Sequence, residues 1–305
     1  MNVGIIGLGL IGGSLGRAVK AKTEHRVFGM DINPDAEEKA LLLNAIDRTL
    51  SDEEYGELDI LIYAVTPRIF AGANDTNGAS GGNGTKGADG VRAAAGRLKD
   101  GAVILDVAGT KAVITAEMKK LTKEYPTLEF VAAHPMAGRE FSGVNYSSPS
   151  LFERASILLV PVKAELDTLA ALKKFFVGIG FDCVRFTTSE EHDRIIAYTS
   201  QLPHVLSSCY IGSPTAEFHY GFSAGSFRDL SRVARMNAEM WTELFTENKE
   251  NLLFELDGML ARLKEMRDRI ARSDTDGLKE LLSSNSAKKE ALDKAGRAWK
   301  KKNKE

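Results

Sequence analysis

The chain has 305 residues and a formal net charge of −2, so it carries no overall basic field of the kind that binds nucleic acid non-specifically. With 43% hydrophobic and 27% charged residues, its composition is that of a folded globular protein and not of a disordered chain. The length corresponds to about two ordinary domains. Composition therefore favours a protein that acts on small molecules.

Neither a disulfide framework nor a membrane segment is expected. Cys183 and Cys209 are the only cysteines and have no companion residues at metal-ligand spacing, so we expect no metal site. The N-terminus lacks the pattern of a signal peptide, and no apolar run approaches the roughly 18 residues of a membrane span. These features predict a cytoplasmic protein without membrane or nucleic-acid partners.

The first 160 residues alternate short strands rich in Val and Ile with helical patterns, which is typical of βαβ units around a parallel sheet. The expected strands lie near residues 2–7, 26–31, 59–65, 102–107, 129–133 and 156–161. The expected helices lie near residues 11–21, 34–44, 111–123 and 164–179. The pattern predicts an α/β fold in which residues 1–162 form a Rossmann-type, doubly wound dinucleotide-binding domain.

Residues 71–90 interrupt this alternation, because seven glycines and three asparagines stand where a covering helix is due. Such a composition offers little to bury and predicts a flexible loop, with a helix resuming near residues 88–98. A phosphate-binding P-loop is disfavoured, since the pattern that ends in Gly-Lys-Ser/Thr is missing.

The second half of the chain is predicted to be helical. From about residue 188 the strand signal ends, and long amphipathic stretches follow at 189–211, 225–235, 237–271 and 275–300. We expect residues 163–305 to form an all-α domain. Because so few long helices cannot cover one another's apolar faces, a homodimer is expected.

A glycine pattern near the N-terminus indicates the cofactor. Gly7, Leu8, Gly9, Leu10, Ile11 and Gly12 follow a strand and open a helix. In this context the glycines allow a tight turn, close approach of a pyrophosphate and close helix packing. Asp31 ends the next strand, where a carboxylate accepts hydrogen bonds from the adenosine ribose and repels a 2′-phosphate. The sequence predicts NAD as cofactor.

Two further strand ends are expected to border the nicotinamide. Val65, Thr66 and Pro67 follow one strand, and Asp106 ends the next. Ligands of open α/β sheets bind outside the carboxyl ends of the strands, so we assign all four residues to the cofactor site.

His134 is the predicted catalytic base, because it follows an apolar strand in a nucleotide fold and has an ordinary pKa near neutrality. In the helical half, Arg228 and Arg232 lie on one helix face and suit an anionic substrate, although a solvated charge pair with Asp229 is the alternative. The sequence around His204 is compatible with either a structural or a functional role. We expect the remaining histidines to lie on the surface: His25, His192 and His219.

The segments GLGLIGGSLG, VFGMD, DVAGTK, HPMAGRE, SQLPH and SFRDLSRVA, followed by Trp241, together resemble the prephenate dehydrogenase family, which includes arogenate dehydrogenases of tyrosine biosynthesis. The resemblance implies NAD-dependent oxidative decarboxylation of prephenate and a helical dimerisation domain. It implies that His134 accepts the proton of the substrate hydroxyl and that Arg232 binds a substrate carboxylate. It also implies a set of pocket residues: Ser200, His204, Glu140, Arg228, Asp229 and Trp241. We assign Ser200 and His204 to catalysis together with His134 and Arg232, and we add Arg139 and Thr110 to the substrate contacts.

This chain departs from the family pattern at three places. Gly109 stands where relatives often have a serine beside the catalytic histidine, Gln201 where many have histidine, and Arg139 where some have threonine. Three alternatives therefore accompany the prephenate assignment. They are an arogenate dehydrogenase, a β-hydroxyacid dehydrogenase or imine reductase, and a non-catalytic NAD-binding sensor.

Overall fold

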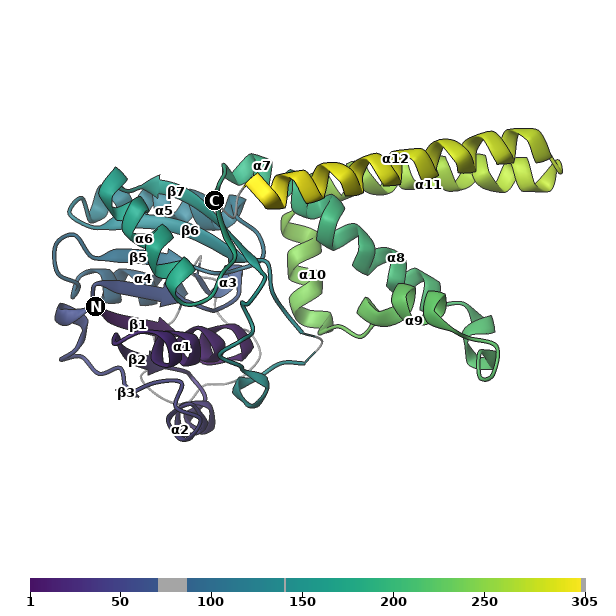
Figure 1. Ribbon diagram of the computed structural model, residues 1–305. Helices are drawn as coiled ribbons and strands as arrows, with labels where there is room; N and C mark the ends of the chain where they lie inside the picture. Colours follow the sequence, from purple (N-terminus) through teal and green to yellow (C-terminus); the bar gives the residue numbers. More distant parts are fainter. Residues whose placement is uncertain (71–86, 140, 303–305) are drawn as a thin grey trace.

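The protein consists of a sheet domain and a helical domain, seen at the left and right of Figure 1. This computed structural model describes residues 1–70, 87–139 and 141–302. The helical domain ends in a long hairpin of two helices that projects away from the sheet (Figure 1). The predicted division into an α/β part and an all-α part is confirmed.

Within the described residues, eight strands form one sheet in the order β3-β2-β1-β4-β5-β6-β7-β8. The strands are β1 (Asn2–Ile6), β2 (Arg26–Met30), β3 (Arg48–Thr49), β4 (Ile60–Tyr63), β5 (Val103–Asp106), β6 (Glu129–Pro135), β7 (Ser156–Lys163) and β8 (Cys183–Phe186). Neighbouring strands are parallel except β6 and β7, which are antiparallel. The expected doubly wound sheet is present, and the short edge strands β3 and β8 are additions to the prediction.

Alternation of side chains along the strands places helices on both faces of the sheet. Val3 and Ile5 of β1 belong to one buried cluster, whereas the next residue, Ile6, belongs to the cluster on the opposite face. The helices of this domain are α1 (Leu10–Lys22), α2 (Pro34–Leu42), α3 (Pro67–Phe70), α4 (Gly87–Ala95), α5 (Ala112–Glu124) and α6 (Leu166–Gly178). Side chains of α1, α2 and α6 pack on the first face, and those of α3, α4 and α5 on the second.

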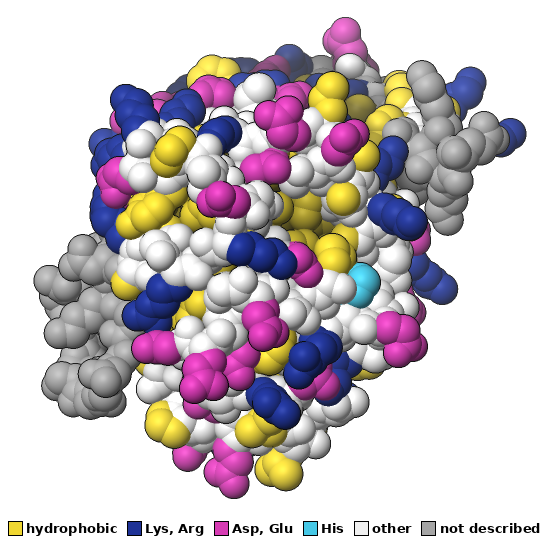
Figure 2. Space-filling view, turned by 90° about the vertical axis from the view of Figure 1, so that its left-hand side faces the viewer, with side chains coloured by type: hydrophobic (Ala, Val, Ile, Leu, Met, Phe, Trp, Pro, Cys, Tyr) yellow, Lys and Arg dark blue, Asp and Glu magenta, His cyan; other side chains and the backbone are white. Residues whose placement is uncertain are grey.

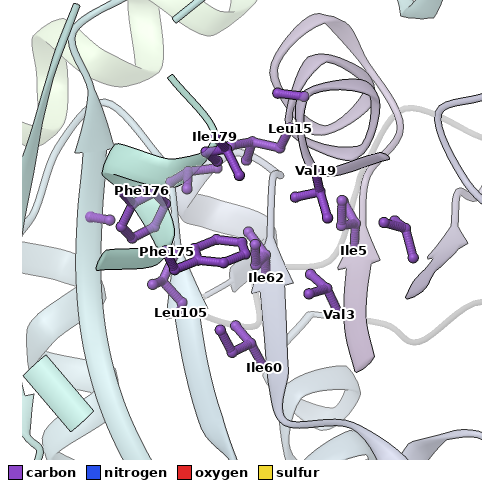
Figure 3. Close-up of a cluster of buried hydrophobic side chains, with 14 of the residues drawn as sticks. Val3, Ile5, Leu15, Val19, Ile60, Ile62, Leu105, Phe175, Phe176 and Ile179 are labelled. Carbon is purple, nitrogen blue, oxygen red and sulfur yellow. The ribbon is translucent and has the colours of Figure 1, made fainter. Parts of the chain in front are cut away.

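Helix α6 belongs to the sheet domain, which moves the domain boundary. Figure 3 shows Phe175, Phe176 and Ile179 of this region packed against Leu105 and Ile62 of the sheet. The sheet then continues to β8. The boundary expected at residues 162/163 divides this core, because an amphipathic helix that covers a sheet cannot be distinguished by periodicity from one in a bundle. We propose a boundary near residues 187–188 instead.

The helical domain contains α7 (Ser189–Ile196), a π-helical segment (Ala197–Gln201), α8 (Leu202–Ile211), α9 (Gly225–Ser231), α10 (Ala238–Glu247), α11 (Lys249–Ala271) and α12 (Thr275–Lys302). The single helix expected over 237–271 is interrupted between α10 and α11 at Asn248. The side chain of Asn248 is buried, where its amide donates to the backbone oxygen of Asp193 and to Oε1 of Gln201, at 2.8 Å each. These bonds fix α10 and α11 against α7.

The glycine-rich segment lies mostly outside the described residues. Residues 71–86 are not among them, so the predicted loop is untested there. Helix α4 begins at Gly87, close to the expected start at 88. Residues 87–90, expected to belong to the loop, are therefore helical.

Charged side chains of both signs are interspersed over the face of the sheet domain shown in Figure 2. This distribution agrees with the near-zero net charge. Across the described parts of the chain, we find no helix with the length and apolar character that a bilayer crossing requires.

Candidate active site

The glycine loop between β1 and α1 has the geometry of a dinucleotide cradle. Gly7 has a φ of +91°, and a Cβ atom there would lie 2.5 Å from the carbonyl oxygen of Ala64. A Cβ atom at Gly12 would lie 1.9 Å from the carbonyl oxygen of Gly7. At Gly9, by contrast, a Cβ atom would meet nothing within 4 Å in the described structure. Gly7 and Gly12 therefore serve the turn and the packing, and the space in front of Gly9 suits a pyrophosphate.

The start of α1 supplies hydrogen-bond donors to that space. Gly9 is the N-cap and has no side chain to cap the helix, so the first N–H groups of α1, from Leu10 and Ile11 on, are free to bind an anion. Leu8 is fully buried, and its N–H donates to Oδ2 of Asp31 at 2.7 Å. Leu8 therefore shapes the loop, and its N–H is not available to a phosphate.

Asp31 lies at the carboxyl end of β2, where the ribose of the adenosine is expected. Its Oδ1 accepts from the N–H of Asn33 at 2.9 Å, and each carboxylate oxygen keeps a lone pair for a ribose hydroxyl. Glu37 of α2 accepts from the N–H of Asp31 at 2.9 Å, which brings a second carboxylate to this edge. Two carboxylates disfavour a 2′-phosphate, which favours NAD over NADP.

The segment after β4 lies beside the glycine loop. A Cβ atom at Gly7 would lie 3.0 Å from Cγ1 of Val65, and Pro67 begins α3. The backbone oxygen of Thr66 accepts from the N–H of Phe70 at 3.1 Å. The segment Val65–Pro67 is thus at the edge where the sequence predicted a cofactor contact, and that contact remains a prediction.

Asp106 is buried and does not face a ligand. Its carboxylate accepts from the N–H groups of Ala108 and Ala133, at 2.8 and 3.2 Å, and pairs with Nζ of Lys111 at 2.6 Å. Burial raises the pKa of Asp106, and the Lys111 ammonium opposes that change. The direct cofactor contact predicted for Asp106 is wrong, because three donors already occupy a carboxylate that is 1% exposed. Its role is to fix the ends of β5 and β6.

His134 lies near the carboxyl end of β6 and is the first member of a hydrogen-bonded series. Its Nδ1 lies 2.9 Å from Nε2 of His192, and Nδ1 of His192 lies 2.7 Å from Oδ1 of Asp193. Asp193 also accepts from the N–H groups of Lys111 and Ala112, at 2.9 and 2.8 Å. Two residues of α7 thereby orient an imidazole on the sheet.

The expectation that His192 lies on the surface is wrong. His192 is 1% exposed, because α7 turns it towards the end of β6. Burial lowers the pKa of His192, and its bond to Asp193 opposes that change. The pKa of His134 is lowered well below its ordinary value of 6.5 by burial first, then by His192 and Lys111. Both imidazoles are therefore neutral at neutral pH, and an adjacent His-Asp pair on an amphipathic helix was the sequence signal for His192.

Helix α10 contacts the segments that follow β4 and β5. Oε1 of Glu243 accepts from the N–H of Arg68 at 2.7 Å, and Thr110 donates its hydroxyl hydrogen to Oε2 of Glu247 at 2.5 Å. A Cβ atom at Gly109 would lie 3.0 Å from Cδ2 of Leu244, so this leucine occupies the space that a serine would need. Sequence reasoning missed Glu243 and Glu247, because their partners are far away in the chain.

The predicted contact between Thr110 and the substrate is wrong. It is 1% exposed, and its hydroxyl group is bound to Glu247. Burial raises the pKa of Glu247 to about 7, while the hydrogen bond from Thr110 opposes the rise. The bond between Thr110 and Glu247 connects the two domains. Glu247 is partly protonated at neutral pH.

Three of the predicted pocket residues lie together in the helical domain. Nδ1 of His204 donates to the backbone oxygen of Ser200 at 2.8 Å, and the His204 ring stacks on Trp241 with centroids 3.7 Å apart. The bond to Ser200 leaves Nε2 of His204 as an acceptor. Ser200, His204 and Trp241 thus form one cluster between α8 and α10.

The predicted arginines lie further along the helical domain, and their shared pocket with His134 stays a prediction. Arg232 is exposed and follows α9. Arg228 and Asp229 are exposed and form an ion pair of 3.6 Å, as the alternative interpretation expected. Arg139 is exposed on the segment after β6, and Glu140 lies outside the described residues. In the same region, the guanidinium of Arg235 lies 5.3 Å from the ring centre of Phe141. This contact places the segment after α9 against the segment after His134.

A dinucleotide cradle after β1 and an oriented, neutral histidine near the end of β6 lie at the same carboxyl edge of one sheet, and together they define a dinucleotide-dependent dehydrogenase. Residues 88–184 match the family model described as prephenate dehydrogenase, nucleotide-binding domain, and residues 188–284 match the model described as prephenate dehydrogenase, dimerization domain. A cyclohexadienyl dehydrogenase of Zymomonas mobilis is 31% identical, over 95% of this chain and 96% of that protein. A prephenate dehydrogenase of Bacillus subtilis is 28% identical, over 90% of this chain and 71% of that protein.

Solved structures agree with these sequence matches. The prephenate dehydrogenase of Aquifex aeolicus, in complex with hydroxyphenyl propionate and NAD+, has a TM-score of 0.76 and 26% identity, over 96% of this chain and 98% of that one. The present chain belongs to the prephenate dehydrogenase family and is an NAD-dependent dehydrogenase.

Alanine at Gly9 and alanine at Gly12 should have different effects. We expect Gly12→Ala to lower the free energy of unfolding by about 1–3 kcal/mol, because its Cβ atom has no room against Gly7. Gly9→Ala should keep the stability and weaken NAD+ binding, because its Cβ atom enters the space for the pyrophosphate. Thermal unfolding and calorimetric titration with NAD+ measure the two effects. Unchanged NAD+ affinity in Gly9→Ala would contradict the cradle.

Proposed function

We propose that this enzyme oxidises prephenate with NAD+ to 4-hydroxyphenylpyruvate and CO2, and that His134 is the catalytic base. A hydride leaves C4 of the cyclohexadienol ring, the hydroxyl proton passes to His134, and loss of the ring carboxylate as CO2 makes the ring aromatic. The resulting phenolate takes up a proton to give the hydroxyl group of the product. Bound NAD+ supplies the hydride acceptor. The observation that carries this proposal is the series from His134 through His192 to Asp193.

The hydrogen bonds of this series determine which nitrogen of His134 acts. Asp193 accepts two backbone N–H groups, so it is an acceptor towards His192 as well, and Nδ1 of His192 must carry a hydrogen. Nε2 of His192 is then unprotonated and accepts from Nδ1 of His134. This leaves Nε2 of His134 with a free lone pair, which is what a base needs.

The environment also favours the neutral form of His134 before the reaction. Burial, His192 and Lys111 all lower its pKa, so the base is unprotonated at neutral pH. When Nε2 takes the proton, the hydrogen bond through His192 to the Asp193 carboxylate stabilises the imidazolium. The site thus holds a base that is ready at neutral pH and supported when it becomes charged.

Arg232 is proposed to bind a carboxylate of the substrate. Its guanidinium offers two parallel N–H donors for such a group. The contact between Arg235 and Phe141 brings the segment that follows α9 against the segment that follows His134. Ser200, His204 and Trp241 are proposed to line the same pocket, with Arg139 on its other side.

We propose that the enzyme is a homodimer formed through the helical domain. Helices α11 and α12 expose large apolar side chains that a second copy would cover: Leu253, Phe254, Leu260, Leu263, Ile270, Leu282 and Leu292. The family description of residues 188–284 as a dimerization domain supports this arrangement. The cytoplasm remains the predicted location.

Arogenate is the second candidate substrate. The similar protein of Z. mobilis is named for cyclohexadienyl compounds, and prephenate and arogenate both contain that ring. We expect NADH to form with prephenate and NAD+, and to form more slowly or not at all with arogenate. With NADP+ in place of NAD+, NADPH should form more slowly. Absorbance at the NADH band measures all combinations. Turnover of neither compound would contradict the proposed function and favour an NAD-binding sensor or another dehydrogenase.

Replacing the base should remove turnover and leave cofactor binding. We expect His134→Ala to lower kcat by at least ~10²-fold, because a positioned base contributes about that much. NAD+ affinity should survive. In the wild type, kcat/KM should fall on the acidic side with a midpoint below pH 6.5. The reason is that the pKa of His134 is lowered and only its neutral form accepts a proton. An unchanged kcat in the variant would remove His134 from the mechanism.

His192 should act through the tautomer of His134. We expect His192→Phe to lower kcat by roughly 10–100-fold, an effect of the size known for partners that orient ligand histidines in metal sites. Nitrogen NMR of His134 should show hydrogen on Nδ1 in the wild type and a loss of that preference in His192→Phe. A lower kcat with an unchanged tautomer would mean that His192 supports the fold only.

A further inference from the structure

Glu247 is a titratable side chain beside the site that the proposed reaction does not use. It ends α10, is half-buried, and accepts the hydroxyl hydrogen of Thr110 at 2.5 Å. Thr110 follows the carboxyl end of β5, the edge at which an open α/β sheet binds its ligand. The carboxylate is therefore held at the strand end expected to border the nicotinamide.

Several contacts fix α10 in this place. Leu244 lies against Gly109, and its backbone oxygen accepts from the amide of Gln201 at 2.8 Å. Glu243 accepts from the N–H of Arg68 at the start of α3. Because both neighbouring loops are bonded to α10, Glu247 cannot move away from the edge without breaking them.

Among the described residues, two carboxylates and one lysine act on Glu247, and Arg68 of α3 lines the same cavity as Glu247. Glu243 on α10 and Asp193 on α7 both raise its pKa, and Lys111 lowers it. The ammonium of Lys111 is already paired with the Asp106 carboxylate. His192, which is bonded to Asp193, has a lowered pKa and is neutral at neutral pH. A cation that arrives at this edge would therefore stabilise the ionised form of Glu247.

We propose that Glu247 is a specificity-determining residue for the redox state of the cofactor, favouring the positively charged nicotinamide ring of NAD+ over the neutral ring of NADH. The two forms differ by one charge on that ring, so a nearby carboxylate distinguishes them by charge alone. NAD+ would then bind more readily before the reaction, and NADH would dissociate more readily after it. The proposal rests on the proposed function only in placing the nicotinamide at the end of β5.

The proposal requires that cofactor binding be linked to a proton. Because the pKa of Glu247 is about 7, the free enzyme is partly protonated at neutral pH. A positive ring lowers that pKa, so NAD+ binding releases a proton and strengthens as the pH rises through 7. NADH binding should release none. A lowering of half to one unit corresponds to a gain of roughly three- to tenfold in NAD+ affinity relative to NADH.

Calorimetric titration of the full-length enzyme with NAD+ and with NADH tests this directly. At pH 7, in two buffers of different ionisation enthalpy, we expect release of roughly 0.3–0.4 proton per NAD+ and none per NADH. The affinity ratio of NAD+ to NADH should rise about 2.5- to fivefold between pH 6 and pH 8.5. In Glu247→Gln, which keeps an acceptor for Thr110, the ratio should not depend on pH. The exposed Glu250→Gln is the matched control and should behave as the wild type.

A further variant distinguishes the charge of Glu247 from the structural effect of its hydrogen bond to Thr110. Thr110→Val removes a hydrogen bond that lowers the pKa of Glu247, so the pH midpoint should move upward while the dependence remains. A pH-independent ratio in the wild type, or an unchanged dependence in Glu247→Gln, would overturn the proposal. Turnover of prephenate with a pH-independent ratio would refute the role of Glu247 alone. A pH-dependent ratio without turnover would refute the assigned substrate alone.

Discussion

The carboxylate of Asp193 is the interaction on which the arrangement of the site depends. It lies on α7 in the helical domain and accepts the N–H groups of Lys111 and Ala112, which open α5 in the sheet domain. The same carboxylate holds His192, which in turn holds His134. One buried anion thereby joins the domains and orients the proposed base. Because an unpaired buried carboxylate is strongly unfavourable, the geometry of all its donors is tightly constrained.

Burial determines which side chains of the site are charged. The pair of Lys111 and Asp106 is excluded from water, and removing one partner of such a pair typically costs about 3–5 kcal/mol. The ammonium of Lys111 also helps to keep His134 neutral. Glu247 differs from this pair, because partial burial raises the pKa of its carboxyl group to about 7, so that it is partly ionised at neutral pH. The edge of the sheet therefore combines a neutral base with a carboxylate that responds to charge.

Local patterns were sufficient for much of the fold and part of the site. The glycines between Gly7 and Gly12 and the carboxylate of Asp31 act through nearby backbone, so their geometry follows from spacing. His134 could be singled out because it follows a strand. For Asp106 and Thr110, local patterns are insufficient. Both stand at a strand end, where ligand contacts are common, but their polar atoms bond to other residues of the protein, among them Ala133 and Glu247, which are far away in the chain.

The sequence by itself determined the α/β class, the positions of most strands along the chain, the glycine cradle and the helical second half, because short-range periodicity and turn chemistry specify them. Only the tertiary structure decided that α6 belongs to the sheet, that His192 is buried, and that Glu247 reaches Thr110. Each of these depends on contacts between residues far apart in the chain. A side chain's partners, burial and proton affinity are properties of the assembled fold, and no local pattern carries them.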